Sequence, residues 1–140
     1  MTLKTLHLLL QLWEILYAHL DFSAKTSAPH RLNTGQARLQ IMMQYIHDHY
    51  QEEVTLEEIA AAASISKSSA LQIFQSGIQI APVSYLIQYR LMQAAELLYT
   101  TTKPVSIIAI ETGFTSAGYF CRKFKERYQI SPNEYRKQRL

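Results

Sequence analysis

Three observations predict an all-α chain with two helix-turn-helix subdomains, a long linker helix between them and a further N-terminal helix. First, only 4 Gly and 4 Pro in 140 residues leave room for long, uninterrupted helices. Second, apolar residues recur at helical spacing in segments that begin with helix-capping sequences. Third, residues 56–85 are repeated in residues 105–135, and each copy has the size of a helix-turn-helix. With 48% apolar content, the length suffices for one domain of about 100 residues plus an appendage.

The N-terminal helix is predicted over residues 2–22 and is apolar on most of its surface. Its polar side chains form one narrow stripe: Lys4, His7, Gln11, Glu14 and Asp21. Such a helix needs cover on most sides. We therefore expect it to form a dimer interface or to pack on a neighbouring domain outside this chain; packing on the rest of the chain is the alternative.

This apolar run does not predict a membrane span or a signal peptide. It is interrupted by polar residues before reaching the roughly 18–20 apolar residues that a span requires, and it lacks a cleavage site after a compact apolar core. A polar, proline-containing linker is predicted over residues 23–30. The expected division is therefore an N-terminal helix and linker in residues 1–35 and a domain with both helix-turn-helix units in residues 36–140.

Capping sequences place the next helices. A helix is predicted from Ala37 to Tyr50. Thr55 followed by Glu58 forms a capping box, so a further helix should begin at Leu56. The linker helix is predicted over residues 83–100.

The repeat aligns the two copies residue by residue. At an offset of 49 the matched pairs are Ile59-Ala60 with Ile108-Ala109, Ser64 with Gly113, Ile65 with Phe114, and Ser66 with Thr115. At an offset of 50 they are Phe74 with Phe124, Ile80 with Ile130, Pro82 with Pro132, and Tyr85 with Tyr135. Each proline is expected at the first position of a helix, where the missing N–H costs nothing. Ser131 and Glu134 add a second capping box.

The second helix-turn-helix, residues 105–127, is expected to read DNA. Gly113 should adopt a positive φ in its turn, and Phe114 should fill the angle between the helices. The predicted recognition helix, residues 116–127, directs Tyr119, Phe120 and Phe124 to the core. Its opposite face carries Ala117, Gly118, Cys121 and Arg122. Small side chains at its start allow close approach to the bases, and arginine suits guanine O6 and N7. Lys123, Lys125 and Arg127 are candidate phosphate contacts.

The first helix-turn-helix, residues 56–75, should bind DNA more weakly. Its recognition helix is predicted over residues 67–75, with Ser68, Leu71 and Gln72 on the outward face and Lys67 as a candidate phosphate contact. Gln72 takes the place of Arg122, and glutamine suits adenine. Glu57 and Glu58 lie nearby and make the electrostatic environment poorer for DNA.

The distribution of charge favours the same end of the chain. Net charge is +3, but residues 103–140 hold eight Lys or Arg against three Glu. Such a cluster suits a phosphate-facing surface, and a solvated helix face is the alternative. The single cysteine cannot form an internal disulfide, so a cytoplasmic location is expected.

No enzyme site or cofactor site is predicted. His47 and His49 lie two residues apart on a helix and therefore point in different directions, and no Cys or Asp cluster completes a metal site. Cys121 has basic neighbours, which suit a redox or alkyl-acceptor role, but a small contact residue is the favoured interpretation. The alternative to a DNA-binding regulator is a helical protein-interaction module whose helix-turn-helix units are vestigial.

Residues 38–138 resemble the DNA-binding domain of the AraC/XylS family of bacterial transcription regulators. The motif that carries this resemblance comprises Ile108-Ala109, Gly113-Phe114, Tyr119-Phe120, Arg122, Phe124-Lys125, Ser131-Pro132 and Tyr135-Arg136. Matches in the first half are Ala60, Ser66, Phe74, Pro82, Tyr85, Arg90 and Ala94. Ser69, Ala70 and Gln72 depart from the family's more usual aromatic, leucine and arginine, and Gln79 stands where a glycine is usual.

This resemblance implies seven helices and two recognition helices that enter successive major grooves of double-stranded DNA. It also implies the candidate base-reading residues, which are Ala117, Gly118, Cys121 and Arg122 in the second unit and Ser68, Leu71 and Gln72 in the first. It also implies RNA polymerase as a candidate partner. A homodimer through residues 2–22, or through a sensor domain outside this chain, is the other expected association. No membrane partner is expected.

Overall fold

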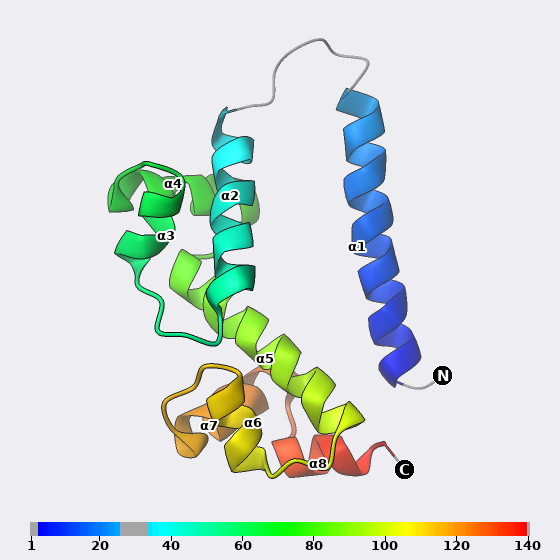
Figure 1. The fold of residues 1–140 in the computed structure, drawn as a ribbon. Coiled ribbons are helices and arrows are strands. Elements are labelled where there is room, and N and C mark those ends of the chain that lie inside the picture. Colours follow the sequence, from blue (N-terminus) through cyan, green and yellow to red (C-terminus); the bar gives the residue numbers. More distant parts are fainter. Residues whose placement is uncertain (1–2, 26–33, 140) are drawn as a thin grey trace. The chain divides into compact units, whose positions relative to one another are not determined.

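The computed structural model describes residues 3–25 and 34–139, with side chains described for residues 3–15 and 34–139. The described chain is helical, with eight α-helices and no strand (Figure 1). It divides into two compact parts, residues 1–33 and 34–140. The all-α prediction is confirmed.

Helix α1 (Leu3–Lys25) is longer than predicted. Residues 23–25, expected in the linker, continue the helix, because no glycine or proline interrupts it before Pro29. The rest of the expected linker lies outside the described residues. Exposed large apolar side chains along α1 are Leu3, Leu6, Leu8, Leu9, Leu10, Leu12, Trp13 and Ile15. Within the described ranges, no helix is long and apolar enough to cross a membrane.

The first module, as we call helices α2 to α4, consists of α2 (Thr34–His49), α3 (Leu56–Ala62) and α4 (Lys67–Ile78). Helix α2 begins three residues before its predicted start and packs on both α3 and α4. The buried core of this module is completed by Leu86 from the linker helix; its other members are Leu39, Met42, Ile46, Ile59, Ala60, Ala70 and Phe74.

The second module contains α6 (Val105–Glu111), α7 (Ala117–Tyr128) and α8 (Pro132–Lys137). Its core includes the second half of the linker helix and consists of Leu91, Ala94, Ala95, Leu98, Ile108, Ala109, Phe114, Phe120 and Phe124. Helix α5 (Pro82–Thr100) therefore contributes to both cores and joins the modules as one continuous rod (Figure 1).

The caps confirm the predicted helix starts. Thr55 Oγ1 accepts from Glu58 N at 3.2 Å, and Ser131 Oγ accepts from Glu134 N at 3.2 Å. Pro82 and Pro132 both occupy the first turn of their helices. These local bonds satisfy N–H groups that have no partner inside the helix.

One detail of the repeat alignment was wrong. Ser66 and Ser116 are the two N-caps, and each accepts a bond from the amide three residues on, at 3.2 and 3.1 Å. Ser66 therefore corresponds to Ser116 and not to Thr115. Thr115 is the extra residue of the second copy, because the second turn has one more residue than the first between the end of one helix and the N-cap serine of the next.

Candidate nucleic-acid interface

The turn of the second module positions its recognition helix. Gly113 has φ +95°, a conformation that favours glycine, as predicted. The buried Thr112 hydroxyl donates to Ile108 O at 2.7 Å and so closes the end of α6. Phe114 is buried, with its ring 5.0 Å from that of Phe120. The sharp turn thus ends in an aromatic contact that fixes the angle between α6 and α7.

Recognition helix α7 has one buried side and one open side. Phe120 and Phe124 are fully buried, and Gly118, Arg122 and Lys125 are exposed. A Cβ at Gly118 would meet nothing within 4 Å, so its surface is open space. A DNA groove that approaches this side of α7 would meet exposed backbone at Gly118 and the guanidinium of Arg122 one turn later.

Two of the candidate base-reading residues are less open. Ala117 and Cys121 are half-buried, and Cys121 packs against the second core. Cys121 is a free thiol. Cys121 therefore lies at the edge between the buried and the open side of α7, next to the exposed Arg122.

Tyr119 packs against the guanidinium of Arg122, a contact that the sequence did not predict. Its ring lies 5.3 Å from Arg122 Cζ and 5.7 Å from Lys123 Nζ. It also lies 6.2 Å from the Phe114 ring. A guanidinium over an aromatic face loses part of its freedom before binding. The spacing of Tyr119 and Arg122, one helical turn apart, was the available signal.

Part of the C-terminal positive charge serves the fold. Arg136 Nε donates to Leu98 O at 3.2 Å, and Arg139 donates to Tyr99 O and Thr101 O at 3.2 and 3.3 Å. These carbonyls lie at the C-terminal end of α5, where cations are favourable. The charge excess of residues 103–140 is therefore not one phosphate-facing surface.

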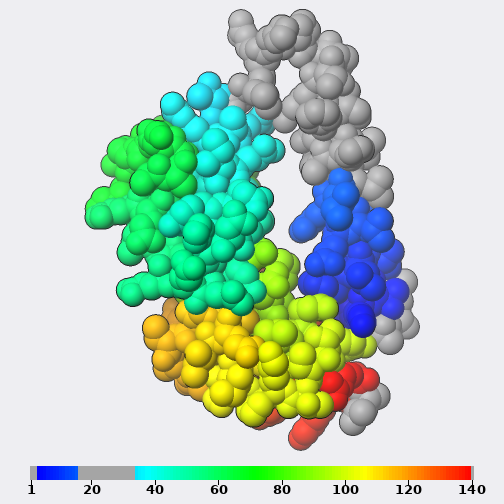
Figure 2. All heavy atoms as spheres, in the orientation of Figure 1, coloured from blue at the N-terminus to red at the C-terminus, as the bar shows by residue number. Residues whose placement is uncertain are grey.

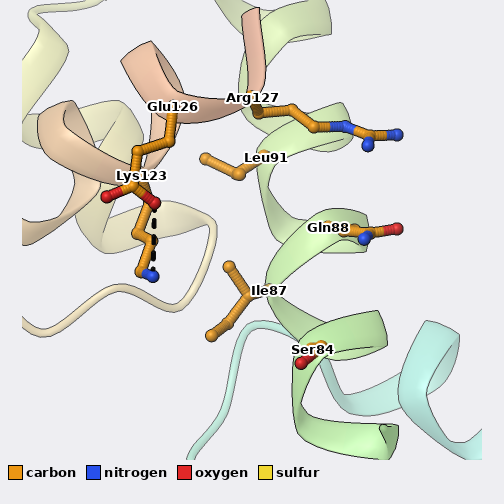
Figure 3. Close-up of a pocket in the computed structure, with 7 residues that line it drawn as sticks. All are labelled: Ser84, Ile87, Gln88, Leu91, Lys123, Glu126 and Arg127. Carbon is orange, nitrogen blue, oxygen red and sulfur yellow. Dashed lines mark hydrogen bonds and ion pairs between the residues drawn. The ribbon is translucent and has the colours of Figure 1, made fainter. Parts of the chain in front are cut away.

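Lys123 is also engaged within the protein. It forms an ion pair with Glu126 at 3.4 Å along one edge of a groove between α5 and α7 (Figure 3). The groove has a volume of about 260 Å³. Its floor is apolar, with Ile87 and Leu91, and Arg127 lies at its rim. Lys125 and Arg127 are exposed.

The first recognition helix, α4, shows the weaker electrostatics that its sequence predicts. Ser68, Leu71 and Gln72 are exposed. Lys67, at its first turn, is 3.2 Å from Glu57 of α3. The positive charge of Lys67 is thus partly neutralised within the first module.

The histidines have separate partners. His47 Nε2 is 2.6 Å from the Tyr85 hydroxyl, and His49 Nδ1 is 3.3 Å from Glu52 Oε2. Within the described part of the chain, no group of three His, Cys, Asp or Glu could hold a metal ion.

Two short-turn helix pairs, each ending in a capped and partly open second helix, define the class of tandem helix-turn-helix proteins. A helix-turn-helix domain family model matches residues 59–138. A curated relative from Haemophilus influenzae, an HTH-type transcriptional regulator, is 38% identical over 107 residues, covering 76% of this chain and 34% of its own length. The chain belongs to the AraC/XylS family and carries its helix-turn-helix domain.

Solved structures of the family share this fold. An AraC-type regulator from Chromobacterium violaceum has a TM-score of 0.72 at 26% identity, covering 75% of this chain and 94% of that one. The AdpA DNA-binding domain, solved in complex with a target DNA, has a TM-score of 0.68 at 30% identity, covering 71% and 89%. The present chain spans about a third of the length of the first curated relatives that it matches.

Proposed function

We propose that this chain regulates transcription by sequence-specific binding of double-stranded DNA, with the second module as the dominant reader. The observation that carries the proposal is the open face of α7, where exposed Gly118 and Arg122 stand beside exposed Lys125. This face has the size and donors that a major groove requires. The solved AdpA domain with its target DNA supports the same mode of binding.

The residue roles follow from their positions. Ala117, Gly118, Cys121 and Arg122 read bases in one major groove, and Ser68, Leu71 and Gln72 read the next. Lys67, Lys123, Lys125 and Arg127 contact phosphates, which position the protein without specifying a sequence. No catalytic residue or cofactor takes part, and the regulator acts in the cytoplasm, where it meets the bacterial chromosome.

Selection of bound sites from a random duplex pool, followed by titration at several salt concentrations, tests this function. A regulator enriches a bipartite sequence with half-sites about 10 base pairs apart. Four phosphate contacts give a slope of about −3 to −4 in log affinity against log salt concentration. Absence of enrichment together with a flat salt dependence would overturn the proposal.

That outcome would favour the second candidate, a helical protein-interaction module. The observation on its side is the Lys67–Glu57 pair, which reduces positive charge on the first recognition helix. A module of this kind would bind a protein partner with no dependence on duplex DNA.

Two further associations are proposed. The apolar side chains of α1, exposed from Leu3 to Ile15, support self-association through residues 2–22 or cover by a sensor domain outside this chain. RNA polymerase is the proposed partner for transcriptional output. Light scattering of the 140-residue chain, compared with a Leu9→Asp, Trp13→Asp variant, tests the first: loss of a dimer supports it, and a monomer in both contradicts it.

A further inference from the structure

Arg90 lies on the linker helix α5 where the two cores meet. Leu86, one turn before it, belongs to the first core, and Leu91, the next residue, belongs to the second. Arg90 itself is half-buried. Helix α5 is the segment of chain that connects the two modules. The orientation of the modules relative to each other therefore depends on this helix and on the contacts made around Arg90.

On the side of the first module, Arg90 holds the end of helix α2. Its Nε donates to Tyr50 O at 2.7 Å, and its Nη2 donates to Glu52 O at 2.7 Å. A turn closed by Glu52 N and His49 O, at 2.9 Å, presents these carbonyls together. Two short bonds from one charged, planar group fix the direction of α2 relative to α5.

On the side of the second module, the same guanidinium lies against the helix-turn-helix turn. A Cβ at Gly113 would lie 2.6 Å from Arg90 Nε and 2.3 Å from Tyr50 O. The turn between α6 and α7 therefore packs directly on the Arg90–Tyr50 contact. In Figure 2 the teal surface that follows α2 meets the yellow and orange surface of the second module.

The turn beside Arg90 leads into the recognition helix of the second module. Phe114 follows Gly113 in this turn, and its ring lies 6.2 Å from the ring of Tyr119 in the first turn of α7. Burial lowers the pKa of Arg90, and the charge interaction with Tyr119 partly offsets this effect. Arg90 is therefore linked to α7 through the Gly113 turn.

We propose that Arg90 is a positioning residue that sets the orientation of the two recognition helices and hence the half-site spacing that the protein accepts. The inference rests on the proposed function. Binding of the second half-site gains from the first only if the linkage holds both helices in register with the DNA. Arg90 touches no base in this arrangement and acts through Tyr50, Glu52 and Gly113.

The test uses the bipartite duplex selected by the wild-type chain, the same duplex with one base pair added to or removed from the spacer, and the second module's half-site alone. We expect Arg90→Gln to weaken binding to the bipartite duplex about tenfold or more. Binding to the single half-site stays at the wild-type value, and the dependence on spacer length becomes flatter. Equal loss on both duplexes, or unchanged spacer dependence, would overturn the proposal.

Arg136→Gln is the matched control. Arg136 also donates its Nε to a carbonyl at a helix end, Leu98 O at 3.2 Å, but inside the second module. It should lower affinity for every duplex by the same factor and keep the spacer dependence. If the wild-type chain selects no bipartite sequence, the proposed function fails instead.

The orientation of the two modules can also be measured without DNA, so this second test does not require the target sequence. Ser76 and Glu126 are exposed and occupy equivalent positions of α4 and α7, so spin labels there, in a Cys121→Ser background, report the distance between the modules. Arg90→Gln should broaden the distance distribution, and Arg136→Gln should leave it narrow. If Arg90→Gln does not fold, Arg90→Lys replaces it in this measurement. Lysine keeps the positive charge but cannot make the two parallel hydrogen bonds of the planar guanidinium, so this variant should also broaden the distance distribution. An unchanged distribution in a folded Arg90 variant refutes the idea.

Discussion

The two modules share one backbone plan but differ in what fills and covers it. Both recognition helices begin at a serine cap and end at a left-handed glutamine, Gln79 with φ 59° and Gln129 with φ 68°. Ala70 in the first core corresponds to Phe120 in the second, and both are fully buried. A repeated fold is thus kept by its caps and turns, while the side chains inside and outside it are free to diverge.

The divergence is largest in the aromatic content. In the second module Phe124 lies 5.7 Å from Phe120, 4.5 Å from Tyr128 and 5.4 Å from Tyr135. In the first module the equivalent Phe74 has Tyr85 at 6.0 Å, and Ile78 takes the place of Tyr128. The module that carries the open, basic reader therefore also has the larger aromatic core.

Removal of the central ring should show this difference most strongly. Phe124→Ala is expected to lower the free energy of unfolding by about 3–5 kcal/mol, because a fully buried aromatic leaves a cavity. Phe74→Ala should cost about 1 kcal/mol less, since fewer ring contacts are lost. Urea unfolding followed by circular dichroism measures both. A larger loss for Phe74→Ala would reverse the comparison.

High pH should weaken the second module through Tyr128. Burial raises the pKa of Tyr128 to about 12 from 10.0. The unfolded chain loses this proton first, so the stability contribution is intact below pH 10 and is lost as pH rises towards 12, by about 2–3 kcal/mol.

Urea midpoints at pH 8 and pH 11 measure the effect. Tyr128→Phe removes the ionisable hydroxyl, so its midpoint should fall less than that of the wild type. The pKa values of Tyr45 and Tyr89 are also raised, and their contributions cancel in the difference between the two proteins. Burial raises the pKa of Tyr135 as well, and because its ring lies 5.6 Å from that of Tyr128, the difference reports this tyrosine pair. The same fall in both proteins would show that Tyr128 plays no part.

The readers themselves give the next contrast. Arg122→Ala should cost about 1–3 kcal/mol of binding free energy and relax the preference at one base pair. Gln72→Ala should cost less, because glutamine is uncharged and Lys67 on the same helix is paired with Glu57. Titration against the selected duplex and its single-base variants measures both. Equal losses contradict the asymmetry, and uniform weakening across sequences would make Arg122 a phosphate contact.

The smallest expected effect sharpens the electrostatic side of the comparison. Glu57→Gln removes the partner of Lys67, which lies 3.2 Å away. Without the competing carboxylate, the phosphate contact of Lys67 should become stronger, and the salt slope should steepen by at most about 0.9, the value for one full phosphate contact. Glu53→Gln is the control, since Glu53 is exposed on the same module. An unchanged slope for Glu57→Gln would mean that Lys67 does not approach DNA.

The sequence predicted most of the local structure because that structure depends on residues three or four apart. The capping boxes at Thr55 and Ser131, the positive φ of Gly113 and the prolines that begin α5 and α8 are all of this kind. The change of the repeat offset from 49 to 50 showed that one residue is gained, but it did not show where; the sequence therefore missed the correspondence of Ser66 with Ser116, which the two N-cap hydrogen bonds fix.

The candidate reading residues were also accessible from the sequence, since the core face of α7 implies its opposite face. Their exposure in α4 and α7 agrees with this reasoning for Gly118, Arg122 and Gln72, and their roles stay predictions. Cys121 is half-buried because it lies at the edge of the core, which a helical pattern does not resolve.

What the sequence by itself determined is therefore the double helix-turn-helix plan and the starts of the serine- and threonine-capped helices, since each follows from local periodicity and caps. Only the tertiary structure decided which cations are available and which side chains hold the two modules against each other. Arg136 and Arg139 donate to carbonyls 38 to 40 residues away, and Arg90 donates to carbonyls 38 and 40 residues away. The physical reason is that such bonds depend on where packing brings chain segments together, which no short-range pattern encodes.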